Sequence, residues 1–78
     1  MQLTVKYFGM LAEVTGKAEE QISCDICNVE ELLLFLFKSY PDLEKKDCKI
    51  AVNQTLVSGV IEISENDEIA LLPPFAGG

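Results

Sequence analysis

Hydrophobic and polar positions alternate with a period of two near the start of the chain. Along residues 3–8, one face is apolar and consists of Leu3, Val5 and Tyr7. The alternation returns in residues 20–26, after Gly16 and Lys17 at a turn. A period of two is typical of a half-buried strand, so we expect two strands that form a hairpin.

After residue 28 the period becomes that of a helix. Asn28 can accept a hydrogen bond from a first-turn N–H, and Glu31 can reach back to complete a capping box. A core-facing stripe with the spacing i, i+3, i+4, i+7, i+11 consists of Val29, Leu32, Leu33, Leu36 and Tyr40. Pro41 disfavours a helical conformation for the residue before it, so we expect the helix to end near Ser39 or Tyr40.

The second half of the chain has the pattern of three more strands. Residues 50–57 are apolar on both sides of Asn53 and Gln54, a pair suited to a tight turn because asparagine tolerates positive φ. A turn at residues 65–67 leads into a last short strand at 68–72. One helix among about five strands packs naturally across one face of a mixed sheet. This predicted α+β roll resembles the ubiquitin-like β-grasp.

Size and charge restrict the classes of partner. The chain has 78 residues, no histidine and a net charge of −7, which disfavours nucleic acid and anionic membranes and favours a basic protein surface. The longest apolar run, residues 32–37, is far shorter than the roughly 20 residues that span a bilayer. With three cysteines and no signal-peptide pattern, we expect a reduced, cytoplasmic protein.

The cysteines and the acidic residues give weak signals. Cys24 and Cys27 have CxxC spacing, but only Cys48 remains and no histidine can complete a tetrahedral zinc site. We therefore interpret them as structural. A cluster near the last turn consists of Glu62, Glu65, Asp67 and Glu68. It lacks a glycine-bearing calcium loop, so we expect a solvated acidic surface that steers the chain toward basic partners.

The ending LLPPFAGG indicates a segment with a chemical use. Pro73 and Pro74 lack donors and have fixed φ, so they stop strand pairing and stiffen the exit of the chain. We expect both prolines to belong to the segment that binds a partner. Ala76, Gly77 and Gly78 have little or no side chain and can enter a narrow channel with the α-carboxylate leading. We expect a domain over residues 1–74 and a flexible tail over 75–78.

Use of this carboxylate requires activation, for example by ATP as an acyl adenylate on Gly78. The sequence has no histidine and no glycine-rich phosphate loop, so we expect the catalyst to be a partner that consumes ATP, with no cofactor bound here. Phe75 can anchor the tail in a partner pocket or fold back onto the domain, and its position after Pro74 favours the anchor.

Three segments carry a resemblance to a known family: VKYFGMLAE at 5–13, AVNQTLVS at 51–58 and NDEIALLPPFAGG at 66–78. Together they resemble the small subunit of molybdopterin synthase, a MoaD-type sulfur carrier with a ubiquitin-like fold. The resemblance extends over essentially the whole chain. It implies that the last strand runs parallel beside the first in the centre of the sheet, so that the tail leaves from there into solvent.

The resemblance also implies a mechanism and a set of partners. An E1-like enzyme adenylates Gly78, and a sulfur donor such as a cysteine desulfurase relay converts the adenylate to a thiocarboxylate. The tail, from Phe75 through Ala76 and Gly77, then enters the large subunit and donates sulfur to cyclic pyranopterin monophosphate. Two small and two large subunits form a heterotetramer, and the large subunit supplies the catalytic groups.

Three apolar residues lie off the expected core. Phe8 is on the strand face opposite Tyr7 and either contacts the large subunit or packs under a local loop; both interpretations stay open. Leu34 and Phe35 lie off the helix stripe. We expect the loop after Pro41 to cover them, whereas an exposed pair would indicate a further contact surface.

Three other functions are compatible with the diglycine. A carrier for another pathway, such as thiamine thiazole synthesis, would use the same chemistry, although its known members lack the double proline. A protein modifier would form an isopeptide bond to lysines. A plain interaction module would not depend on Gly77 and Gly78.

Overall fold

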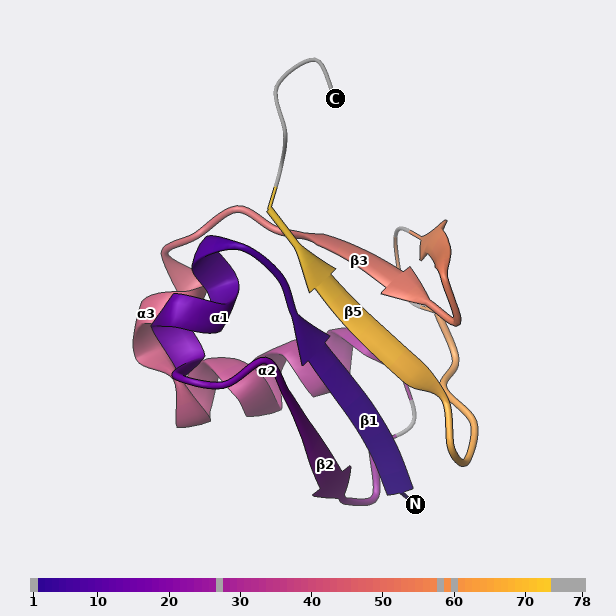
Figure 1. The fold of residues 1–78 in the computed structure, drawn as a ribbon. Coiled ribbons are helices and arrows are strands. Elements are labelled where there is room, and N and C mark those ends of the chain that lie inside the picture. The colour runs from indigo at the N-terminus through magenta and orange to yellow at the C-terminus, as the bar shows by residue number, and fades with distance from the viewer. Residues whose placement is uncertain (1, 27, 58, 60, 74–78) are drawn as a thin grey trace.

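One mixed sheet of five strands, in the order β2-β1-β5-β3-β4, forms the body of the protein (Figure 1). The computed structural model describes residues 2–26, 28–57, 59 and 61–73. Its strands are β1 (Gln2–Tyr7), β2 (Glu19–Ser23), β3 (Lys49–Val52), β4 (Thr55–Val57) and β5 (Glu68–Leu72). The central pair, β1 and β5, is parallel and the other neighbours are antiparallel. The expected β-grasp fold is confirmed, including the parallel pairing of the first and last strands.

The first two strands pair as expected, but their connection is longer than a turn. Leu3 of β1 lies opposite Ile22 of β2 in antiparallel register, and β2 ends at Ser23, short of the expected limit at residue 26. Between the strands lies a helix that the pattern did not predict, α1 (Met10–Thr15). It buries Leu11 completely, and Gly16 ends it in the left-handed conformation that favours glycine.

The long helix α2 (Val29–Ser39) begins and ends where the sequence predicts. The Asn28 side chain accepts a hydrogen bond from the backbone N–H of Glu31 at 2.8 Å, as a helix N-cap does. After Tyr40 a second helix that was not predicted, α3 (Pro41–Glu44), uses Pro41 in its first turn, where the missing N–H costs nothing.

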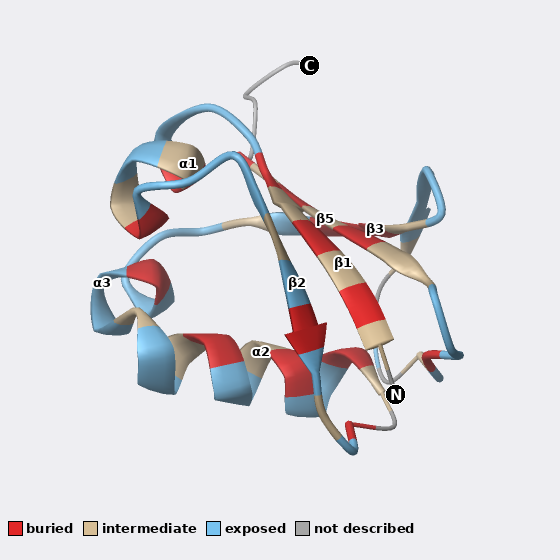
Figure 2. Cartoon of the chain, turned by 60° about the horizontal axis from the view of Figure 1, so that its bottom comes forward, coloured by how far each residue is buried: buried red, intermediate tan, exposed pale blue. Residues whose placement is uncertain are grey.

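The hydrophobic core lies between α2 and one face of the sheet, with α1 and α3 closing one end (Figure 2). Alternate strand residues supply one side of it, and the predicted stripe of α2 supplies the other. The core cluster consists of Leu3, Val5, Tyr7, Leu11, Ile22, Ile26, Val29, Leu32, Leu36, Leu43, Ile50, Ile63, Ile69 and Leu71. Burial of each such side chain stabilises the fold by about 1.5–3 kcal/mol.

The expected cover over the outer side of α2 is wrong. Leu34 is 59% exposed and Phe35 is 40% exposed. The exposed side of α2 faces away from the sheet (Figure 2). The segment after Pro41 does not cover them because its own apolar residue, Leu43, turns into the core and is completely buried. This leaves an apolar pair in solvent. Within the described part of the chain, no helix is long and apolar enough to cross a membrane.

Candidate functional site

The candidate site is the place where β5 ends and the C-terminal segment begins. β5 lies between β1 and β3. Its last residue, Leu72, is opposite Lys49 of β3, and on the other side the Phe8 N–H donates to the Leu71 carbonyl at 3.1 Å. Pairing therefore holds both sides of β5 up to its end, and Pro73 follows from the centre of the sheet.

Pro73 is buried and its ring packs against Gly9, the residue directly before α1. Gly9 has φ 58° and ψ −132°, a combination outside the left-handed helical region and readily adopted only by glycine. A Cβ at Gly9 would lie 2.9 Å from Cγ of Pro73. The domain thus holds Pro73, the first proline after β5, in a close contact that requires glycine at position 9, which we call the Pro73 seat.

Sequence reasoning assigned Pro73 to partner binding and missed Gly9. In the structure, the Pro73 ring contacts the domain itself. A glycine directly after the predicted first strand could have drawn attention to Gly9. Its contact with Pro73, 64 positions later, has no local sequence pattern that could reveal it.

The face of the sheet opposite α2, which we call the open face, carries apolar side chains beside this exit together with the Lys6–Glu68 ion pair. Register pairs Ala70 with Lys6 on one side and with Ala51 on the other, and Ala51 with Leu56. Phe8 continues this face beyond β1 and is 44% exposed, while Leu56 is 61% exposed. The packed alternative for Phe8 is therefore wrong, and its ring is available for contact.

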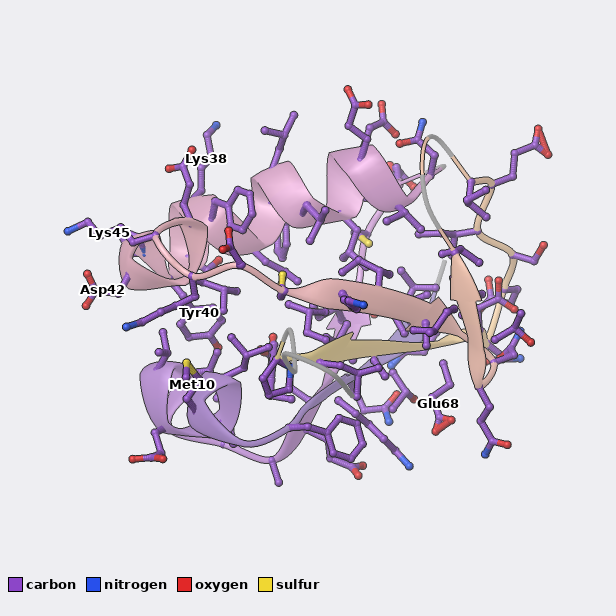
Figure 3. All side chains as sticks on the ribbon, turned by 90° about the horizontal axis from the view of Figure 1, so that it is seen from above. Met10, Lys38, Tyr40, Asp42, Lys45 and Glu68 are labelled. Carbon is purple, nitrogen blue, oxygen red and sulfur yellow. The ribbon has the colours of Figure 1, made fainter. Side chains whose placement is uncertain are left out.

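The acidic residues near the last turn are largely engaged within the protein. Asp67 accepts hydrogen bonds from the Ser64 N–H at 2.8 Å and from Nδ2 of Asn53 at 3.0 Å. Glu68 pairs with Lys6 at 2.8 Å, and this hydrogen bond raises the pKa of the Lys6 ammonium. Glu68 lies on the outside of the sheet (Figure 3). Among the described residues, no group of three His, Cys, Asp or Glu side chains could hold a metal ion.

A polar cluster that sequence reasoning missed joins β1, β2 and the end of α2. Tyr7 Oη and Tyr40 Oη both donate to one oxygen of Glu20, at 2.5 and 2.8 Å. Lys17 lies 3.6 Å from the other oxygen, and the two tyrosine rings meet edge to face at 6.1 Å. We call these residues the Glu20 cluster.

Electrostatics favours the ionised form of Glu20. Partial burial would raise the pKa of the Glu20 carboxyl, but the tyrosine hydrogen bonds and Lys17 outweigh it and lower that pKa. Burial, followed by the hydrogen bond to Glu20, raises the pKa of Tyr7 far above its ordinary value. Tyr7 therefore stays protonated and remains a hydrogen-bond donor to Glu20.

The chain as a whole can be compared with known proteins. The model of the ThiS family matches residues 5–78. The chain belongs to the ThiS family. A curated relative, the molybdopterin synthase sulfur carrier subunit of Chlamydomonas reinhardtii, is 34% identical over 83 residues and is covered completely, as is this chain. The resemblance to molybdopterin synthase sulfur carriers is thereby confirmed.

Two solved structures share the fold of this ThiS-family chain. Small archaeal modifier protein 1 from Haloferax volcanii is 26% identical, with a TM-score of 0.84 and 100% of both chains covered. A chain in the complex of subunits 1 and 2 of the molybdopterin-converting factor from Helicobacter pylori is also 26% identical, with a TM-score of 0.73 and 100% of both chains covered.

Of the remaining residues that the sequence singled out, the structure describes Cys24 and Cys48. Cys24 is half-buried and packs against the core, in agreement with a structural role. Cys48 is also half-buried, and burial, helped by the neighbouring Asp47, raises the pKa of its thiol. Cys27 lies outside the described residues. So do Pro74, Phe75, Ala76, Gly77 and Gly78, whose roles stay predictions.

Proposed function

We propose that this chain is the sulfur-carrier small subunit of molybdopterin synthase. The observation that carries the proposal is that the family match runs through Gly78. The fold agrees with it, because the segment that leads to Gly78 leaves from β5, the central strand, and Pro73 is held against Gly9. An active segment that must reach into another protein gains from a fixed base, because fewer conformations are lost on binding.

In the proposed chemistry the α-carboxylate of Gly78 attacks the α-phosphate of ATP, and pyrophosphate leaves. The terminal sulfur of a persulfide on a donor such as a cysteine desulfurase relay then displaces AMP and forms an acyl disulfide. A thiol cleaves its S–S bond, forms a disulfide with the donor cysteine and releases the thiocarboxylate. This group donates its sulfur to cyclic pyranopterin monophosphate, and water returns Gly78 to a carboxylate. The E1-like enzyme consumes the ATP, so this chain needs no bound cofactor. It supplies the acyl group, and its partners supply the catalysts.

The proposed partner surface on the domain is the open face, with Phe8 at the side nearest the tail. An exposed aromatic ring on the same face as Ala70 and the exposed Leu56 suits a complementary apolar surface. The relative in the Helicobacter pylori complex supports a large-subunit partner. We propose a cytoplasmic heterotetramer of two small and two large subunits, in which Phe75, Ala76 and Gly77 enter the large subunit.

Reconstitution with the large subunit and precursor tests this function. Replacement of Gly78 by a bulky residue, or addition of one residue after it, should abolish sulfur transfer and leave the thermal unfolding curve unchanged. Phe8→Ala should instead weaken binding of the large subunit and leave charging of Gly78 intact. Full transfer by the Gly78 variants would contradict the proposal.

A second candidate is a protein modifier, because the chain is also similar to small archaeal modifier protein 1. Both functions begin with adenylation of Gly78 and differ in the acceptor. A modifier would give conjugates of higher mass on lysines in cell extracts, lost in the Gly78 variants. A carrier for thiamine thiazole synthesis would instead transfer sulfur to a thiazole precursor and not to the pyranopterin.

A further inference from the structure

The outer side of α2 carries a stripe whose order is self-complementary. The stripe has the spacing i, i+3, i+4, i+7 and consists of Glu31, Leu34, Phe35 and Lys38. All four side chains are exposed, and Figure 3 shows Lys38 directed away from the sheet. An acidic residue thus begins the stripe, two large apolar residues form its middle and a basic residue ends it. We call it the outer stripe.

We propose that the outer stripe binds a second copy of this chain, with the two α2 helices antiparallel. A two-fold axis between residues 34 and 35 places Leu34 of one copy against Phe35 of the other. The same axis places Glu31 opposite Lys38 at both ends. Such an interface is isologous, because each copy contributes the same residues.

Charge selects this arrangement over its alternative. In a parallel pair, Glu31 would meet Glu31 and Lys38 would meet Lys38, and like charges at close range oppose binding. In the antiparallel pair Glu31 meets Lys38 at both ends of the stripe. Exposed ion pairs contribute little affinity themselves, so they fix the orientation while burial of Leu34 and Phe35, 59% and 40% exposed, supplies the attraction.

The shape beside the stripe also suits a second helix. An open hollow runs along the C-terminal half of α2 and is lined by Leu34, Phe35, Phe37, Lys38 and Glu44. In the antiparallel pair, the N-terminal half of the other α2 lies over this hollow. Side chains entering such a recess contact it on several sides.

The size of the surface sets the strength of the dimer. Stable interfaces bury about 1,600 Å² in total, more than one short helix stripe can supply from each copy. The dimer is therefore weak and depends on concentration. It leaves the open face free, because α2 lies on the other side of the sheet (Figure 1), and each copy can still bind a partner through its open face.

Sedimentation equilibrium of the full chain, from about 10 μM to about 1 mM, spans the range of such weak complexes. The proposal expects a monomer–dimer equilibrium in the wild type. Phe35→Asp should weaken it by about 100-fold or more, because each dimer would bury two unpaired carboxylates. Thermal unfolding shows whether the variant folds, as expected for an exposed position. A wild type that stays monomeric across the range would overturn the proposal.

Charge reversal tests the orientation. Lys38→Glu should weaken the dimer, and adding Glu31→Lys to that variant should restore it, since both ends regain opposite charges. Glu30→Lys, in the same helical turn but off the stripe, is the matched control and should leave self-association unchanged. Equal weakening in the single and double variants would overturn the antiparallel pairing. Loss of partner binding by Phe35→Asp, with a monomeric wild type, would assign the stripe to a different protein.

Discussion

Removal of the Glu20 carboxylate should destabilise the fold more than its partial exposure suggests. Tyr7 is 3% exposed and donates to Glu20, so Glu20→Ala leaves a buried hydroxyl without its acceptor. An orphaned buried polar group costs about 1–3 kcal/mol. Tyr40 is only partly buried, and its hydroxyl can regain water, so it adds less. The expected loss in free energy of unfolding is about 2–3 kcal/mol.

This loss is large enough to measure by thermal denaturation. In a domain of this size 1 kcal/mol shifts Tm by about 4–8 °C, so Glu20→Ala should lower Tm by roughly 10–20 °C. Glu19→Ala is the matched control, because Glu19 is the preceding residue of the same strand and is exposed. It should change stability by less than about 0.5 kcal/mol. Equal effects of the two variants would refute the account of the Glu20 cluster.

The pH dependence follows from the direction of the shift. The pKa of Glu20 is lower in the folded state than its ordinary value of 4.5, so its contribution is fully present above that value. The contribution is lost as pH falls through the folded-state pKa. The stability gap between wild type and Glu20→Ala should therefore be constant near neutral pH and shrink below about pH 4.5. A gap that widens in acid would contradict this assignment.

Other predictions concern the Pro73 seat, the core and the open face. Gly9→Ala should lower the free energy of unfolding in urea by about 2–4 kcal/mol, because of backbone strain and the contact with Pro73. Gly16→Ala is the control and should cost about 1 kcal/mol, because a Cβ there meets nothing within 4 Å. Equal costs would argue against the contact between Gly9 and Pro73. Leu71→Ala, at a completely buried position, should cost about 2–5 kcal/mol. Leu56→Ala, at an exposed one, should cost almost nothing in unfolding and weaken large-subunit binding in calorimetry; unchanged binding would exclude it from the interface.

The elements that sequence reasoning found are those with a sustained period, a cap or a recognisable turn beside them. Residues 3–8 alternate over three pairs, and α2 has eleven residues with a capping Asn28. The two missed helices, α1 and α3, have six and four residues. A helical stripe repeats only after three or four positions, so such short segments contain too few repeats to separate them from a loop.

The missed parts of the site are contacts between distant residues. Tyr40 and Glu20 are 20 positions apart, and Gly9 and Pro73 are 64 apart. Neither pair has a local spacing that could reveal it, because the fold alone brings the partners together. The predicted cover of Leu34 and Phe35 was wrong for a different reason. The pattern showed that both residues lie off the core stripe, but it did not show that Leu43 points into the core. The predicted chemistry of the tail depends on residue type and order alone, and it stays a prediction.

The most direct measurement is the intact mass of this protein after incubation with its adenylating enzyme, ATP and a sulfur donor. The account predicts a mass gain equal to one sulfur in place of one oxygen, located in the C-terminal peptide at Gly78. An unmodified mass, with an enzyme shown to be active on its own carrier, would contradict the sulfur-carrier function.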